Sequence, residues 1–153
     1  MSGYNEEAYR QARESVIEHP CPFERALLKG CVQCRLARKR LLAERELMTC
    51  TEGNASARCR HFLDAVHHNA RFALHLEANQ PWPFGKEIRA QCGGVLGLID
   101  ALEAPEADVV TLLDTALADG KSPEELPWST IMRSVVHYEP RPHNNRPPKT
   151  TPD

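Results

Sequence analysis

The spacing of the cysteines constrains this chain more than any other feature. Five of the six cysteines lie in the 39 residues from Cys21 to Cys59, and the sixth is Cys92. The N-terminal residues are polar and show no signal peptide, so we expect a cytoplasmic protein. In a reducing compartment, clustered thiols are metal ligands or catalytic groups more often than a disulfide framework. The spacing therefore predicts a metal-binding or redox-active thiol protein.

All six cysteines are candidate ligands. Cys31 and Cys34 form a C-x2-C pair, which can place two sulfurs on one metal through a single turn of backbone. Cys50 falls in a segment with loop composition, and Cys59 falls near a predicted helix start, where backbone N–H groups favour a thiolate. These four give C-x2-C-x15-C-x8-C, which can close a four-thiolate site, with Cys21 and Cys92 as further candidates.

Two metal centres compete for these ligands. Zinc commonly takes its thiolates from two close pairs, and the separation of eight residues between Cys50 and Cys59 is unusual for that pattern. Iron–sulfur clusters also use four cysteines, and the larger cluster tolerates scattered ligands. Five cations between Arg35 and Arg45 follow Cys34 and would stabilise a negatively charged cluster. The sequence favours an iron–sulfur cluster; zinc, or free thiols without metal, stay open as alternatives.

Helical periodicity dominates the rest of the chain, and we predict an all-α fold, a small irregular helical bundle. No segment shows clear period-2 alternation. Residues 1–138 are predicted to form one domain with the metal or thiol core in 21–98, and the Pro-rich residues 139–153 a disordered tail. Ser122 and Glu125 match a capping box. The predicted helices cover residues 5–17, 23–29, 35–47, 55–77, 86–102, 105–120 and 128–138.

A glycine-rich stretch surrounds Cys92. Gly93, Gly94 and Gly97 lie in a predicted helix, where each glycine costs about 1 kcal/mol relative to alanine. This pattern indicates a close neighbour, which is either another helix or a cofactor ligated by Cys92. Several histidines also lie on the predicted helix 55–77, and we expect them to face solvent or to have structural partners.

Charge and motifs narrow the functional classes. The net charge is -2, and no apolar run approaches the ~18 residues of a membrane span, so we expect neither nucleic-acid nor membrane binding. No nucleotide-binding or hydrolase motif is present in the sequence. Residues 22–72 hold ten Lys or Arg against five Asp or Glu. This basic half favours a protein partner with an acidic surface, or a larger redox enzyme.

The string CPFERALL, followed by AERE, ARC and QCGG, resembles an uncharacterised group of small cysteine-rich bacterial proteins over Cys21 to Leu98. In that group the close cysteine pair is C-x-C, whereas here Cys31 and Cys34 are separated by two residues. The resemblance therefore gives weight to all the cysteines except Cys31. It implies no activity, substrate or partner.

Together these patterns predict a small metalloprotein rather than an enzyme. Cys21, Cys34, Cys50 and Cys59 would hold an iron–sulfur cluster, with Cys31 or Cys92 as substitute or additional ligands. Its role would be electron transfer, redox sensing or cluster handling beside a larger enzyme. One alternative is a zinc-stabilised interaction module. Another is a thiol redox protein in which Cys31 and Cys34 exchange electrons.

Overall fold

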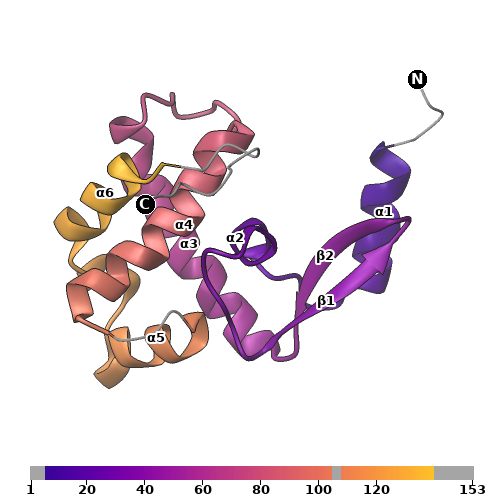
Figure 1. The fold of residues 1–153 in the computed structure, drawn as a ribbon, viewed down its shortest axis with the longest axis horizontal. Helices are drawn as coiled ribbons and strands as arrows, with labels where there is room; N and C mark the ends of the chain where they lie inside the picture. Colours follow the sequence, from indigo (N-terminus) through magenta and orange to yellow (C-terminus); the bar gives the residue numbers. More distant parts are fainter. Residues whose placement is uncertain (1–5, 105–107, 140–153) are drawn as a thin grey trace, which may run out of the picture.

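The computed structural model describes residues 6–104 and 108–139. Figure 1 shows a body of helices α3 to α6 on one side, with α1 and a β-hairpin projecting on the other and α2 between them. The elements, in chain order, are α1 (Glu6–Val16), α2 (Glu24–Lys29), β1 (Ala37–Leu42), β2 (Arg45–Cys50), α3 (Gly53–Ala73), α4 (Phe84–Leu102), α5 (Val109–Ala116), the 3-10 turns η1 (Ala118–Gly120) and η2 (Pro123–Glu125), and α6 (Trp128–His137).

The main hydrophobic core lies in the helical body. Helices α3, α4 and α6 each bury one apolar stripe there, represented by Phe62, Val95 and Ile131, all fully buried. Phe23, at the start of α2, joins this core and lies 6.0 Å from Phe62 between ring centroids. The segment that begins the cysteine-rich region is thereby fixed to the body by burial of a large apolar side chain.

The glycines of α4 allow α6 to pack closely against it. A Cβ at Gly93 would lie 2.6 Å from the Cα of Val135, and one at Gly97 would lie 2.8 Å from the Cα of Ile131. Gly94 faces a different helix, since a Cβ there would lie 3.1 Å from a methyl group of Val66. The close neighbour indicated by the sequence is therefore a helix rather than a cofactor.

The predicted helix over residues 35–47 is wrong, and the all-α assignment fails there. This segment forms an antiparallel hairpin in which Ala37 pairs with Cys50 and Leu42 with Arg45. Ala43 and Glu44 form its two-residue turn with φ of 52° and 68°. Such turns are usually marked by Asn-Gly or Asp-Gly, and the sequence Ala-Glu gives no such signal.

Tertiary contacts explain why the hairpin forms from residues with helical propensity. Strand β2 pairs with β1 along one edge, and along the other edge it bonds to the segment before α2, where Pro20 forms a bridge with Thr49. Leu47 is fully buried against Tyr9 and Ile17, which form a second, smaller core under α1. Packing of this kind routinely overrides local propensity.

The remaining elements agree with the sequence, and the predominantly helical architecture is confirmed. Gly30 ends α2 in the left-handed conformation, with φ of 89°. The capping box at Ser122 is also present, with the Ser122 N–H donating to the Glu125 carboxylate. Residues 105–107 of one predicted helix, and the tail beyond Glu139, lie outside the described residues. No helix in the described ranges is long and apolar enough to cross a bilayer.

Candidate metal centre

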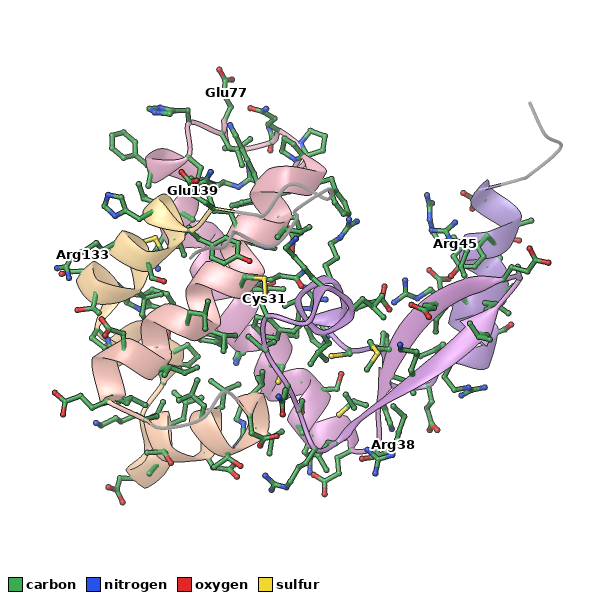
Figure 2. The ribbon with its side chains drawn as sticks, viewed as in Figure 1. Cys31, Arg38, Arg45, Glu77, Arg133 and Glu139 are labelled. Atoms are coloured by element: carbon green, nitrogen blue, oxygen red, sulfur yellow. A yellow bond between two sulfur atoms is a disulfide. The ribbon has the colours of Figure 1, made fainter. Side chains whose placement is uncertain are left out.

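The two cysteines of the C-x2-C pair lie in different environments. Cys31 forms a disulfide with Cys92 of α4, with Cα atoms 6.1 Å apart, whereas Cys34 is a free thiol. Figure 2 shows this sulfur–sulfur bond beside the Cys31 label, between α2 and α4. The disulfide was not predicted from the sequence, in which all six cysteines are candidate ligands. Bound to each other, Cys31 and Cys92 have no thiol to offer a metal.

The four remaining cysteines meet at one pocket. Cys21, Cys34, Cys50 and Cys59 all line a narrow space between α2, the base of the hairpin and α3, and sulfur atoms are visible in this region of Figure 2. Each comes from a different segment of the chain. Apart from the hydroxyl group of Ser56, every other lining side chain is apolar. This is the set that we identified in the sequence as the leading group of ligands.

Backbone pairing places Cys21 opposite Met48, two residues before Cys50 on β2. The Cys21 N–H donates to the carbonyl of Met48 at 3.2 Å, and the Cys50 N–H donates to the carbonyl of His19 at 2.7 Å. These bonds attach the segment before α2 to the free edge of β2. The segment before α2, which was not predicted to be extended, thus brings Cys21 to the same pocket as Cys50, 29 positions later in the sequence.

Cys34 is held by the start of α5. Val109 donates its N–H to the carbonyl of Gln33 at 2.8 Å, and the carboxylate of Asp108 accepts the N–H of Arg35 at 2.6 Å. Asp108 also caps α5 by accepting the N–H of Thr111 at 3.0 Å. Asp108 was not predicted as a functional residue, although an Asp directly before the apolar run VVTLL is a recognisable N-cap.

Cys59 lies on the buried face of α3. This helix begins at Gly53, directly after β2, so the turn that follows Cys50 carries the chain into the helix that presents Cys59. The side chain is buried, as its helical position predicts. Arg58 is adjacent, and its positive charge opposes the effect of burial on the Cys59 thiol.

Burial keeps the thiols of Cys21, Cys34 and Cys59 protonated at neutral pH. Burial raises the pKa of Cys21 and of Cys59 from 9.0 to about 12, and it also raises the pKa of Cys34. Repulsion between the neighbouring sulfurs adds to each of these shifts. A metal ion or cluster must therefore displace several protons when it binds here. The high pKa also makes these thiols poor nucleophiles.

Backbone N–H groups nevertheless point at two of the sulfurs. The N–H of Phe23 is hydrogen-bonded to the sulfur of Cys21, and those of Leu36 and Val110 to the sulfur of Cys34, and each bond lowers the pKa of its thiol. Hydrogen bonds of this kind stabilise thiolates and tune metal–thiolate centres. They are in place before any metal enters the pocket.

The pocket is narrow. Its volume is about 10 Å³, which is roughly the room that one water molecule needs. Among the residues that the structure describes, no group of three or more His, Cys, Asp or Glu side chains is arranged to hold a metal ion. Four thiol groups suit a soft metal chemically. The sulfurs must nevertheless shift before they can ligate one, because they are not arranged around a common point.

The histidines of α3 take no part in this pocket. His61 and His68 are exposed, whereas His67 pairs with Glu87 of α4 at 2.9 Å and stacks on Trp82. Burial raises the pKa of Glu87, but hydrogen bonds from His67 and Gln91 outweigh burial and lower the pKa overall. The structural role that we expected for these histidines holds for His67.

The basic segment after Cys34 lies on the hairpin. Arg38, Lys39, Arg40 and Arg45 are exposed there, and Arg35 forms an ion pair with Asp108 at 3.2 Å. None of these cations lines the thiol pocket. Their effect on a bound cluster would therefore be a long-range one, weaker than expected from their place in the sequence directly after Cys34.

Comparisons of the chain with protein-family models, with curated proteins and with solved structures found no significant match.

Proposed function

We propose that the pocket formed by Cys21, Cys34, Cys50 and Cys59 holds an iron–sulfur cluster and that the protein is a carrier or sensor rather than an enzyme. One observation carries the proposal: the four cysteines outside the disulfide come from four segments and line one apolar pocket. Such a cluster supplies one-electron redox chemistry when bound. The fold would keep water from the centre and direct backbone N–H groups at two of its ligands.

The four cysteines come from segments scattered along the chain, which favours a cluster over zinc. A zinc ion requires each sulfur at about 2.3 Å from one point, and no set of described side chains has such an arrangement. In a cluster, several iron and sulfide atoms lie between the cysteines, so the sulfurs stay farther apart. The narrowness of the pocket requires its walls to separate on loading. Cys21 and Cys34 lie outside helices and strands, where such movement costs least.

A zinc-stabilised interaction module is the second candidate, and the small volume of the pocket favours it. A single ion would fit if the sulfurs moved inward. The thiol redox alternative has less support, because Cys31 is bonded to Cys92 and burial raises the pKa of Cys34.

Anaerobic purification tests the proposal directly. We expect a brown protein that absorbs at roughly 400 nm and contains iron and acid-labile sulfide. Replacing any one of the four pocket cysteines by serine should remove this absorbance, whereas the Cys31→Ala/Cys92→Ala variant should keep it. A colourless protein with stoichiometric zinc would establish the second candidate. A protein that takes up neither metal, even after reconstitution with iron and sulfide, would contradict both.

A further inference from the structure

Cys34 borders two cavities, and it is the one described residue that both have in their lining. On one side is the thiol pocket, where the N–H groups of Leu36 and Val110 are hydrogen-bonded to its sulfur. On the other side is an open cavity of about 340 Å³, which we call the outer cavity. Its lining consists of Gln33, Cys34, Arg35, Asp108 and Thr111. Cys34 therefore lies between the thiol pocket and the surface of the protein.

The other three pocket cysteines are less accessible from outside. Cys50 and Cys59 are buried. Cys21 is partly exposed, but it lines neither the outer cavity nor the cavities beside α1, α5 and the start of α3. The cavity at the start of α3 shares only Val110 with the thiol pocket, and that side chain has no atom that binds metal. The outer cavity is thus the opening that leads to a ligand.

Hydrogen bonds fix the walls of the outer cavity. The guanidinium of Arg35 donates to the hydroxyl of Thr111 at 2.6 Å and to the carboxylate of Asp108 at 3.2 Å. The charges of Arg35 and Asp108 are therefore paired with each other, so neither is free to retain an ion in the outer cavity. The first thiol that an entering ion meets is that of Cys34.

We propose that a soft metal ion enters the thiol pocket through the outer cavity and that Cys34 is its first ligand. In this step a bond between the ion and a water molecule breaks, a bond to the Cys34 sulfur forms, and the thiol proton leaves to water. Cys21, Cys50 and Cys59 then replace further water molecules in the same way. Cys34 lies in a loop, where its movement with the ion costs little. The inference rests on the proposed function, because it gives the route by which the metal centre is loaded.

Thiol labelling of the metal-free, full-length protein tests the route without any substitution. The protein is treated with a limiting amount of N-ethylmaleimide, and peptide mass spectrometry locates the modified cysteine. We expect Cys34 to react at least about tenfold faster than Cys21, Cys50 or Cys59, because a buried thiol is not accessible to the reagent.

A substitution at the rim of the outer cavity tests the route for the metal itself. Gln33 is exposed there, and a tryptophan in its place would cover the opening. The probe is Cd²⁺ alone, whose uptake is followed by the ultraviolet absorbance of cadmium–thiolate bonds. We expect Gln33→Trp to slow both Cd²⁺ uptake and the labelling of Cys34 by about tenfold, and to leave the final Cd²⁺ content unchanged.

Asn54→Trp is the matched control, since Asn54 is also exposed but lines the cavity at the start of α3. It should change the uptake rate less than about twofold. Thermal melts show whether each variant folds, and if Gln33→Trp does not, the labelling of the wild type decides. Labelling of another cysteine before Cys34, equal uptake rates in the wild type and Gln33→Trp, or equal slowing in both variants would overturn the route but leave the metal centre in place. A wild type that binds neither Cd²⁺ nor iron would contradict the proposed function, and the route with it.

Discussion

The thiols of Cys21 and Cys59 give the metal-free protein a pH dependence that can be measured. Burial raises the pKa of each from 9.0 to about 12. Between these values an unfolded chain has released the two protons and the native state retains them. The contribution of the two thiols to the free energy of unfolding is therefore fully present below pH 9. It declines as the pH rises toward 12, by at most about 1.4 kcal/mol per pH unit for each thiol.

Urea denaturation of metal-free protein between pH 8 and pH 10.5 measures this decline. The Cys21→Ala and Cys59→Ala variants should each have a flatter profile, whatever their absolute stability, because each lacks one of the titrating groups. Identical slopes in the wild type and in both variants would show that the two thiols are accessible to water.

The glycines of α4 make a second prediction at the residue scale. Gly93→Ala and Gly97→Ala should each destabilise the protein by about 1–3 kcal/mol, because the new methyl group meets the α6 backbone rather than a side chain that can move. Gly85→Ala is the control: it lies in the same helix with no atom within 4 Å of the added carbon, and it should gain up to about 1 kcal/mol from helix propensity. Chemical denaturation measures all three. A gain at Gly93 would mean that α6 does not pack there.

At the scale of elements, the contact between the Cys34 loop and α5 depends on Asp108. Asp108→Ala removes the cap of α5 and the acceptor of the Arg35 N–H, so we expect a loss of about 1–2 kcal/mol. Cys34 should also react faster with an alkylating reagent in the metal-free protein. Asp100→Ala makes the same chemical change at an exposed position of α4 and should alter neither quantity. An unchanged alkylation rate in Asp108→Ala would show that α5 does not restrain the loop.

The elements also show which parts of the structure can be predicted from sequence. Helices whose ends carry local signals, such as Gly30 after α2 and Ser122 before η2, lie close to where the sequence placed them. The hairpin was missed because its strands consist of residues with helical propensity and its turn, Ala43–Glu44, lacks glycine. What stabilises it is distant in sequence, namely the packing of Leu47 under α1.

In the candidate site, too, the features marked by nearby residues could be predicted, and the one that depends on distant contacts could not. The fold brings the four cysteines that the sequence favoured as ligands to one pocket, but the partner of Cys31 could not be predicted. That pairing depends on how α2 lies against α4, and nothing between Cys31 and Cys34 indicates it. The C-x2-C spacing suggested that Cys31 and Cys34 share one site. In the fold, Cys31 is bonded to Cys92 of α4 and Cys34 lines the thiol pocket.

For the whole molecule, we expect metal binding to be coupled to folding. The pocket joins segments from α2, the hairpin and α3, and the described loops between them contain few apolar side chains. Removing the metal should lower the melting temperature and expose residues 21–59 to protease, because metal–thiolate bonds would otherwise link these segments. Metal analysis must verify the removal. An unchanged melting temperature after complete removal would contradict the coupling.

The disulfide provides a separate link across the molecule, and removing it should affect stability but not metal content. It joins positions 61 residues apart, and a closed loop of that size contributes about 4 kcal/mol in the chain-entropy account. The Cys31→Ala/Cys92→Ala variant should therefore unfold at lower urea concentration, while its folded fraction at low temperature binds as much metal as the wild type. Cys50→Ala, which leaves the disulfide intact, should behave in the opposite way and lose the metal. If metal content instead falls when Cys31 and Cys92 are replaced, these two cysteines belong to the ligand set, and the disulfide is the form that they adopt only when the metal is absent.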